Sequence, residues 1–501
     1  MAFKVTFIGA GSIGFTRGLL RDLLAVKEFS NIEVAFTDIN EKNLEMVTAL
    51  CQRDINENGL NITIQSSTNR RKALEGARYI FTVVRIGGLE AFTHDVEIPL
   101  KYGVDQCVGD TLSAGGIMYG QRGIAEMLNI CKDIREVAEK DCLQLNYANP
   151  MAMLTWACNK YGGVKTIGLC HGVQGGHKQI AKAFGLKKEE VDIVCAGINH
   201  QTWYIQIKHK GDDLTKKVLE AFENHPEFSK TEKVRIDMLR RFGYYSTESN
   251  GHLSEYVPWY RKRPEEIKEW IDLGTWINGE TGGYLRVCTE GRNWFETDFP
   301  NWLKEPALMY SEENRGEEHG SYIIEGLETG RVYRGHFNVV NNGVITNLPG
   351  DAIIEAPGYV DRNGISTPHV GDLPLGCAAV CNVSISVQRL AVEAAIHGND
   401  TLLRQAFMMD PLVGAVCNPP EIWQMVDEML VAQAEWLPQY KDAILAANAR
   451  QASGNLIPTR NYKGAARLKT KTIEEMQQDR EAANENARES DKAKERPSVK
   501  R

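Results

Sequence analysis

The sequence lacks any stretch of 18 uninterrupted apolar residues, and it has no excess of basic side chains. The first absence argues against a membrane-spanning helix. Lys and Arg number 58 against 66 Asp and Glu, so the formal net charge is −8, whereas proteins that bind nucleic acids usually carry a basic surface. We therefore expect neither a membrane nor a nucleic acid among the partners of this chain.

The chain also has no Cys-x-x-Cys pair, and its cysteine count of 11 is odd. Both features argue against a framework of disulfides. The first residues show no basic segment followed by an apolar stretch and a small-residue cleavage site, which a secretory signal requires. These absences predict a cytoplasmic protein whose cysteines are reduced and serve mostly as small core residues.

What is present is a chain of 501 residues, 43% hydrophobic and 25% charged, which is enough for two or three globular domains. Short apolar segments alternate with helical patterns in its first part, as is typical of an α/β fold with a parallel sheet. Two of these patterns predict helices over residues 41–57 and near 122–139. We expect a Rossmann-type domain over residues 1–195. An α+β domain over residues 196–463 should follow, similar in kind to the C-terminal domain of lactate and malate dehydrogenases. Residues 464–501 form a charged tail that we expect to be flexible or an arm for assembly.

A Gly-x-Gly-x-x-Gly pattern directly follows the first predicted strand and opens a helical pattern, which is the context of a dinucleotide-binding turn. Gly9 allows the tight turn, Gly11 lets the backbone approach a pyrophosphate, and Gly14 lets the helix pack close to the strand. Asp38 ends the second predicted strand, where it can accept from a ribose hydroxyl and repel a 2′-phosphate, so NAD is expected rather than NADP. The expected cofactor-binding residues are Gly9, Gly11, Ser12, Ile13, Gly14 and Asp38. The alternative is a glycine-rich turn that binds no dinucleotide.

Polar residues follow two later strands of the same predicted sheet. Asn149 comes just after the strand at 143–147, on the ligand side of such a sheet, where its amide can both donate to and accept from a sugar hydroxyl. Cys170 ends the next strand, and His200 follows further along the chain. A thiolate and an imidazole can be ligands of a divalent metal. The alternative is a buried cysteine and a histidine that is satisfied inside the core.

Several separated motifs resemble those of one known family. They are Ile8-Gly9-Ala10-Gly11-Ser12, Pro99-Leu100-Lys101-Tyr102-Gly103, Gly109-Asp110-Thr111 with Gly115-Gly116-Ile117, Asn146 to Pro150, Gly168-Leu169-Cys170-His171, Ala196-Gly197-Ile198-Asn199-His200 and Asn347-Leu348-Pro349. Together they resemble glycoside hydrolase family 4, the NAD- and metal-dependent glycosidases. The resemblance runs from residue 3 to about residue 440 and leaves only the charged tail outside it.

The resemblance implies an unusual hydrolysis that does not use the common pair of carboxylates. NAD takes hydride from C3 of the sugar, and the resulting ketone acidifies the proton on C2. A metal ion polarises the oxygens at C2 and C3. A base then removes the C2 proton, the aglycone leaves C1, water adds, and the stored hydride returns to C3. The NAD is recycled, so the net reaction is hydrolysis with retained configuration.

The resemblance also implies roles for individual residues. Cys170 and His200 are similar to the metal ligands of the family, in which Mn²⁺ is the usual ion. Asn149 would bind the sugar near its C2 and C3 hydroxyls, and Asp110 stands where the family has an acid that supports the base. Arg85 would reach the substrate or the ribose, and its alternative is an arginine on the surface.

Two departures from the family pattern leave the acid and the base open. His171 stands where the phosphosugar branch has an aspartate acid, which disfavours a 6-phosphoglycoside as substrate. The stretch from His252 to Tyr256 corresponds to one that holds a tyrosine base in that branch. His252 is therefore a candidate for the base or for an added metal ligand, and Tyr256 is the other candidate for the base.

Within the family the motifs are most similar to those of α-galactosidases. Supporting phrases are Asn149-Pro150-Met151-Ala152-Met153, Cys170-His171-Gly172-Val173-Gln174-Gly175, and Thr247-Glu248-Ser249 followed by His252 and Glu255-Tyr256. The alternatives inside the family are an α-glucosidase, an α-glucuronidase and an α-galacturonidase. The alternatives outside it are an NAD-dependent dehydrogenase and a non-catalytic NAD-binding regulator. We expect a small α-glycoside as the substrate, and a homodimer or homotetramer as the assembly.

Overall fold

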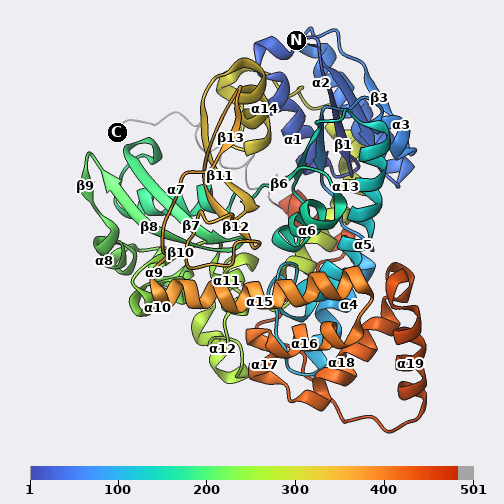
Figure 1. Cartoon of the computed structure of the whole chain (residues 1–501), viewed down its shortest axis with the longest axis vertical. Helices are drawn as coiled ribbons and strands as arrows, with labels where there is room; N and C mark the ends of the chain where they lie inside the picture. The colour runs from blue at the N-terminus through green and yellow to red at the C-terminus, as the bar shows by residue number, and fades with distance from the viewer. Residues whose placement is uncertain (1, 483–501) are drawn as a thin grey trace, which may run out of the picture.

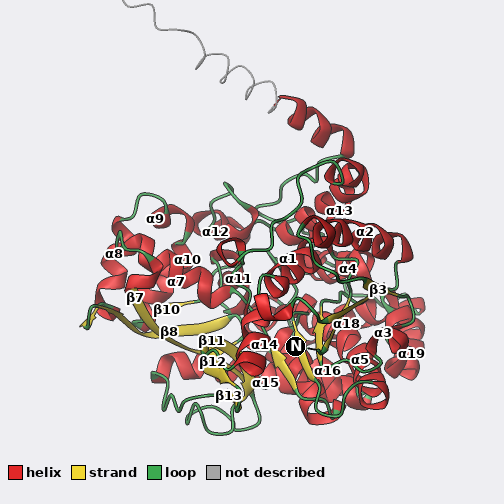
Figure 2. Cartoon of the chain, turned by 90° about the horizontal axis from the view of Figure 1, so that it is seen from above, coloured by secondary structure: helices red, strands yellow, loops and turns green. Residues whose placement is uncertain are grey.

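The computed structural model describes residues 2–482. In this part of the chain a single sheet of 13 strands runs through the molecule, and helices flank both of its faces (Figures 1 and 2). The strands are β1 (Lys4–Ile8), β2 (Glu33–Thr37), β3 (Ile64–Ser66), β4 (Tyr79–Thr82), β5 (Leu143–Asn146), β6 (Thr166–Gly168), β7 (Val191–Ile198), β8 (Gln201–His209), β9 (Asp212–Asp213), β10 (Tyr245–Ser246), β11 (Tyr333–Val340), β12 (Ile353–Asp361) and β13 (Gly364–Ser366). The α-helices are α1 (Ile13–Leu24), α2 (Glu41–Glu57), α3 (Arg70–Leu74), α4 (Gly88–Lys101), α5 (Ser113–Val137), α6 (Met151–Ala157), α7 (Gly172–Ala183), α8 (Val218–Asn224), α9 (Phe228–Thr231), α10 (Lys233–Phe242), α11 (Asn250–Tyr256), α12 (Pro264–Trp270), α13 (Gly283–Trp302), α14 (His319–Thr329), α15 (Leu375–His397), α16 (Asp400–Met409), α17 (Pro411–Val416), α18 (Pro419–Ala432) and α19 (Lys441–Ala452).

The first six strands form a parallel half-sheet in the order β3-β2-β1-β4-β5-β6. This is the strand order of a Rossmann fold, and it confirms the α/β class expected from the sequence. Strands β1, β4 and β5 are buried along their whole length, because helices cover both faces of a parallel sheet and leave no polar side.

The second half of the sheet is antiparallel and continues directly from the first. β11 pairs with β6 through Asn338 and Gly168, and β12 pairs with β7 through Glu355 and Gly197. β7 and β8 then form a hairpin, and β10 closes this side of the sheet. Since the sheet runs on across residue 195, the expected domain boundary there stays a prediction.

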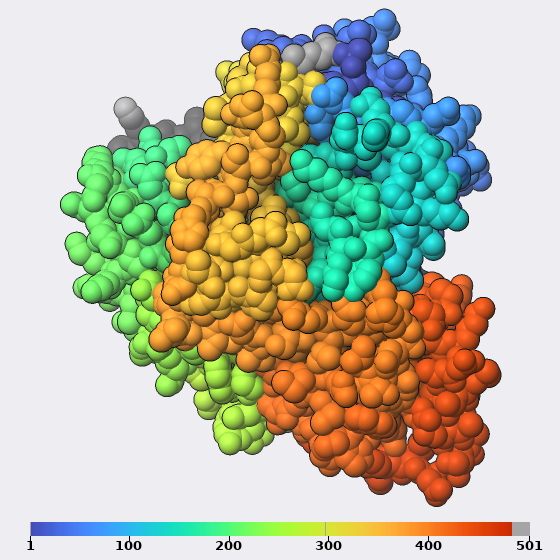
Figure 3. All heavy atoms as spheres, in the orientation of Figure 1, coloured from blue at the N-terminus to red at the C-terminus, as the bar shows by residue number. Residues whose placement is uncertain are grey.

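The long helix α15 crosses the middle of the molecule, above α16 to α18 in the view of Figure 1. Among the described helices it is the one long and apolar enough to cross a membrane by length and composition, with a mean hydropathy of 1.4. Half of that window is buried inside the protein, and the Gln121 Nε2–H of α5 donates to its Ala391 carbonyl at 3.1 Å. This packing is that of a core helix. Figure 3 shows the C-terminal helices, orange to red, forming one continuous mass at the base of the molecule.

Part of the charged tail lies against the rest of the chain. Residues 473–482 are helical, Ala466 is buried against α12, and the Ala465 N–H donates to the buried carboxylate of Asp105 at 3.2 Å. Residues 465 and 466 are thus in contact with the rest of the chain. The expectation of a flexible tail or an arm for assembly stays a prediction. Residues 483–501 of the tail lie outside the described residues.

Candidate active site

The glycine-rich turn joins β1 to α1, and it has no room for larger side chains at two positions. Gly9 has a φ of +83°, and a Cβ on it would lie 2.0 Å from the carbonyl oxygen of Val83. A Cβ on Gly11 would lie 2.8 Å from Oδ2 of Asp38, which accepts a 2.8 Å hydrogen bond from the Gly11 N–H. The carboxylate that the sequence assigns to the ribose thus lies directly beside the turn.

The start of α1 faces open space. A Cβ on Gly14 would meet no atom within 4 Å, so the packing role expected for Gly14 is wrong, because nothing of β1 lies against it. Ser12 is the N-cap and makes no side-chain hydrogen bond to the helix that begins at Ile13. The Ser12 side chain therefore does not occupy the first N–H groups of α1, which suit an anion such as the pyrophosphate of a dinucleotide.

Neighbouring parallel strands bring the expected sites to one edge of the sheet. The last residues of β1 and β4 pair with each other, those of β4 and β5 do the same, and Asn146 of β5 pairs with Gly168 of β6. The glycine-rich turn, Asn149 and Cys170 each follow one of these strands. They therefore leave the sheet at its carboxyl edge, where open α/β sheets bind their ligands.

His200 lies at the tip of the β7–β8 hairpin, in a two-residue loop with Asn199. Its φ is +120°, a backbone conformation that favours glycine and is strained for a residue with a Cβ. Its ring is held on both sides, because Nε2 lies 3.3 Å from Cys170 Sγ and Nδ1 lies 3.0 Å from Thr111 Oγ1. Strain kept by specific contacts is typical of a functional residue.

Cys170, His200 and Glu248 bring three metal-ligating atoms within 4.8 Å of one another. Burial raises the pKa of the Cys170 thiol well above its usual value, and only a cation at the sulfur would favour the thiolate strongly in such surroundings. The donor set therefore fits a bound divalent cation. The sequence predicted the first two residues, whereas it gave Glu248 no role of its own.

Asp110 and Asn149 lie beside this cluster. The Asn149 amide donates to Asp110 Oδ2 at 2.9 Å, and the Thr111 hydroxyl donates to Oδ1 at 2.9 Å. The same Thr111 hydroxyl lies within hydrogen-bond distance of His200. The acid and the amide that the resemblance places at the sugar are thus joined through one hydroxyl to His200, the candidate metal ligand.

Both candidates for the base also lie against His200. The rings of His252 and His200 have centroids 5.2 Å apart, and the Tyr256 hydroxyl lies 3.4 Å from His200 Nδ1. Burial lowers the pKa of His252 to about 4 and raises that of Tyr256 well above its usual value. Ser249 Oγ lies 2.6 Å from His252 Nδ1 and fixes the ring. The geometry brings both side chains to the site.

Glu255 joins the helix that carries these two residues to the loop that carries Asp110. Its buried carboxylate accepts from the N–H groups of Cys107, Val108 and Gly109 at 2.6, 2.9 and 2.9 Å. Burial raises its pKa to about 7 in spite of these donors. The sequence gave no role to Glu255, because its partners are backbone groups far away along the chain.

Arg85 lies inside a cage of aromatic rings and is not a surface arginine. Its guanidinium lies 4.6 Å from the ring centre of Phe92, 5.4 Å from that of Tyr119 and 5.2 Å from that of Tyr284. One nitrogen donates to the Tyr284 hydroxyl at 3.2 Å, and Nη1 is buried without a partner among the described residues. The cage leaves both N–H groups of Arg85 Nη1 without an acceptor among the described residues.

His171 is the N-cap residue of α7 and follows Cys170 directly. Its side chain is 64% exposed, and Nδ1 lies 3.5 Å from a carboxylate oxygen of Glu318. The contact with Glu318 raises the pKa of His171 to about 9. A raised pKa favours the protonated imidazole, the form that a general acid needs.

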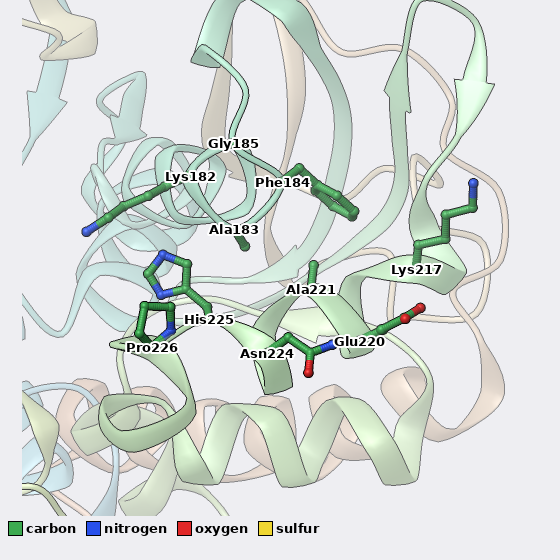
Figure 4. A pocket seen from close by; sticks show the side chains of 10 residues that line it. All are labelled: Lys182, Ala183, Phe184, Gly185, Lys217, Glu220, Ala221, Asn224, His225 and Pro226. Atoms are coloured by element: carbon green, nitrogen blue, oxygen red, sulfur yellow. The ribbon is translucent and has the colours of Figure 1, made fainter.

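A hollow of about 570 Å³ lies elsewhere, between the end of α7 and α8 (Figure 4). It is lined by Lys182, Ala183, Phe184, Gly185, Lys217, Glu220, Ala221, Asn224, His225 and Pro226. The Cys170 cluster lies at the other end of α7, which is about 18 Å away for a helix of this length. The hollow offers no thiol and no pair of carboxylates, so it is not part of the candidate site.

The fold and the site define a class of protein: an α/β enzyme with a dinucleotide turn beside a candidate cation site. Comparison with known families agrees. The model "Family 4 glycosyl hydrolase" matches residues 4–186, and "Family 4 glycosyl hydrolase C-terminal domain" matches residues 195–413. The two matches cover most of the chain, so this protein belongs to glycosyl hydrolase family 4, as the resemblance predicted.

Individual relatives span nearly the whole chain. A protein of Rhizobium meliloti (strain 1021) named alpha-galactosidase is 59% identical over 483 residues, which cover 96% of this chain and 98% of the relative. A 6-phospho-alpha-glucosidase from gut microorganisms, solved with NAD and glucose-6-phosphate, is 26% identical with a TM-score of 0.72, over 87% of this chain and 99% of that one. The 6-phospho-beta glucosidase of Thermotoga maritima, solved with manganese, NAD⁺ and glucose-6-phosphate, shares the fold at 23% identity and a TM-score of 0.70, over 87% and 99%.

Proposed function

We propose that this chain hydrolyses α-galactosides with NAD and Mn²⁺ as cofactors. The relative named alpha-galactosidase supports the substrate, and the relatives solved with NAD and with manganese support the cofactors. The observation that carries the proposal is the shared sheet edge, where the glycine-rich turn, Asn149 and the Cys170–His200 pair lie together. A dehydrogenase of a free hydroxy acid would have no need of this thiol and imidazole pair.

Different residues around the cluster bind the cation and the sugar. When bound, NAD and the cation supply reversible removal of the C3 hydride and polarisation of the oxygens at C2 and C3. Cys170 and His200 hold the cation. Asn149 has both an acceptor and a donor for a sugar hydroxyl, and Asp110 orients that amide through their hydrogen bond.

Two proton transfers then fall to side chains of this chain. His252 or Tyr256 removes the proton from C2, since both lie against His200 on the side of Asp110. His171 gives a proton to the departing oxygen and is held for this by Glu318. The Glu255 carboxylate holds α11, which carries the base, against the loop that carries Asp110.

The alternative substrate is a uronic acid, as in an α-galacturonidase or α-glucuronidase. The unpartnered N–H groups of Arg85 favour it, because a guanidinium without a carboxylate partner suits an anionic ligand. Two acids lie close to His200, the buried Asp110 and the nearly buried Glu248, and they disfavour a charged sugar. We therefore place the neutral galactoside first and the uronides second, with an α-glucosidase as the remaining alternative.

A panel of nitrophenyl glycosides with NAD, Mn²⁺ and a reductant tests the substrate. We expect kcat/KM for the α-galactoside to exceed that for the α-glucoside and the α-galacturonide by about 10²-fold or more, because a site built to bond one hydroxyl rejects analogues that cannot use it. The control is the Arg85→Met variant. It should have the same ratio of kcat/KM for the α-galactoside to kcat/KM for the α-glucoside as the wild type. A faster reaction with either uronide would refute the galactoside proposal.

The state of the cysteines bears on the compartment in which the protein works. The 11 cysteines are all unpaired in the structure, which supports a reducing compartment such as the cytoplasm. The homodimer or homotetramer expected from the sequence stays a prediction.

A further inference from the structure

We propose that Glu248 is a third protein ligand of the cation, beside Cys170 and His200. The inference rests on the proposed function, because it concerns the cation that hydrolysis would use. The resemblance implies the cysteine and the histidine as ligands and leaves His252 open as an added one, which lies in a second group of possible ligands with Asp110 and His200. The structure adds a carboxylate whose oxygen lies within 4.8 Å of both their ligand atoms.

The distances suit one shared cation. Cys170 Sγ lies 3.3 Å from His200 Nε2, and Glu248 Oε2 lies 3.9 Å from the same nitrogen. Atoms that each lie about 2.0–2.3 Å from one ion are themselves about 3–4 Å apart. Two of the three pairs of ligand atoms therefore already stand at the separation that a shared ion requires, and Cys170 Sγ lies within 4.8 Å of the Glu248 carboxylate.

The fold holds Glu248 in this place through its neighbour Thr247. The Thr247 N–H donates to the Thr202 carbonyl at 2.9 Å, and the Thr202 N–H donates to Thr247 Oγ1 at 3.0 Å. Thr202 lies on β8 just after His200. The segment after β10 thus runs beside the hairpin tip, and Glu248 extends from it toward the histidine.

The carboxylate of Glu248 has one ion-pair partner among the described residues, His200 at 3.9 Å. The Glu248 side chain is only 12% exposed, and no N–H or O–H of residues 2–482 donates a hydrogen bond to it. It packs directly on the chain at Gly172, where a Cβ would lie 2.7 Å from Oε1. A nearly buried carboxylate without donors is costly, and a cation between it and Cys170 would remove that cost.

A third ligand changes what the site can do before the sugar arrives. A thiolate and a carboxylate together balance the charge of a divalent ion, so the ion can stay bound without the substrate. The three ligands leave further coordination positions free for the sugar oxygens. We therefore expect this chain to bind Mn²⁺ in the absence of any sugar.

Direct Mn²⁺ binding to the full chain loaded with NAD, without sugar, tests the assignment. Titration calorimetry and the electron paramagnetic resonance signal of free Mn²⁺ give the Kd. We expect Glu248→Gln to weaken binding by about 10²-fold, the upper end of what loss of a group supporting a metal site costs. The matched control is Glu318→Gln, another acid beside the cluster that pairs with His171, and its Kd should stay within about threefold of the wild type.

Two checks keep the outcome readable. NAD affinity and the thermal unfolding midpoint report whether each variant is folded. The second variant is Glu248→Asp, whose shorter side chain keeps the carboxylate and should bind Mn²⁺ more weakly than the wild type. A folded Glu248→Gln variant with wild-type Mn²⁺ affinity would overturn the proposal. If that variant also lost turnover of O-glycosides and kept turnover of thioglycosides, Glu248 would be a proton donor instead. A wild type that binds Mn²⁺ through Glu248 and hydrolyses no α-galactoside would refute the proposed function and leave the ligand assignment standing.

Discussion

Replacement of Cys170 by serine is expected to lower kcat/KM for the α-galactoside by about 10³-fold or more, because the cation contributes several kcal/mol to charge stabilisation and each 1.4 kcal/mol is a factor of ten. His200→Ala should have a similar effect. His200 Nε2 lies 3.3 Å from Cys170 Sγ, so the two side chains can bind the same ion. Both variants should also lose Mn²⁺ affinity, measured by calorimetry on the purified chain.

The control for the thiol is Cys142→Ser. Cys142 is buried just before β5, at the sheet edge opposite the site, so this variant should cost some stability and keep its Mn²⁺. Oxidation of the wild type should inactivate it, since only the reduced sulfur binds metal. Full activity of Cys170→Ser after exhaustive chelation would rule out this cation site.

Gly11→Val is expected to abolish NAD binding and to lower hydrolysis by a comparable factor, on the order of 10³-fold. A Cβ at this position would lie 2.8 Å from the Asp38 carboxylate, and a branched side chain would also fill the approach of the pyrophosphate. Removal of NAD from the wild type should have the same effect. NAD at less than one equivalent per sugar should restore many turnovers, because the stored hydride returns to the same sugar.

The control for the turn is Gly18→Ala on the same helix. No atom lies within 4 Å of a Cβ at Gly18, and alanine favours a helix more than glycine does, so NAD affinity and activity should be kept. Fluorescence titration with NAD measures the affinity. Accumulation of NADH in step with the product would contradict recycling and favour a dehydrogenase.

Local patterns in the sequence were sufficient for the first half of the fold. The predicted helix at residues 41–57 is α2, Glu41–Glu57, because an apolar stripe and the N-cap Asn40 determine it locally. The glycine-rich turn and Asp38 were predicted from their order along the chain, and the structure brings them into contact. Such features depend on neighbours in the sequence and can be read from it.

Helix α5 shows where local patterns fail. The sequence predicted a helix near residues 122–139, whereas α5 begins at Ser113. Its first turns contain several glycines, which have low helix propensity. Close packing compensates for this, since a Cβ on Gly120 would lie 2.8 Å from the Met153 sulfur of α6. Propensity alone could not reveal a contact that forms only when the chain folds back.

The candidate site was predictable where a motif existed and hidden where distant segments meet. Cys170 and His200 were predicted from family motifs, and they lie 3.3 Å apart. Glu248 and Glu255 reach the site from β10 and α11, and their partners lie far away in the chain. A partial signal was present, because Glu248 follows the β-rich stretch Tyr244–Ser246, and an acid after a strand can mark the ligand edge of a sheet.

The contacts near the start of the C-terminal segment could not be predicted from the sequence for a related reason. Its mixed charges and few apolar residues are typical of a solvated tail. In the structure the buried carboxylate of Asp105 accepts from the Tyr462 hydroxyl at 2.8 Å and from the Ala465 N–H. Contacts of this kind leave no apolar pattern in the sequence, so composition could not predict them.

The central claim is that the C2–H bond of the sugar breaks during hydrolysis, and turnover in D₂O tests it most directly. The product galactose is analysed by NMR and mass spectrometry. A base that returns its proton to the same sugar would hide the exchange, so a C2-deuterated substrate is used to measure the primary isotope effect as well. Of the two base candidates, the one whose replacement (His252→Ala or Tyr256→Phe) suppresses exchange at C2 and spares Mn²⁺ binding is the base. For the wild type the account predicts deuterium at C2 of the released galactose. A product without deuterium at C2, together with no exchange in recovered substrate and no primary isotope effect, would contradict elimination and leave direct displacement at C1.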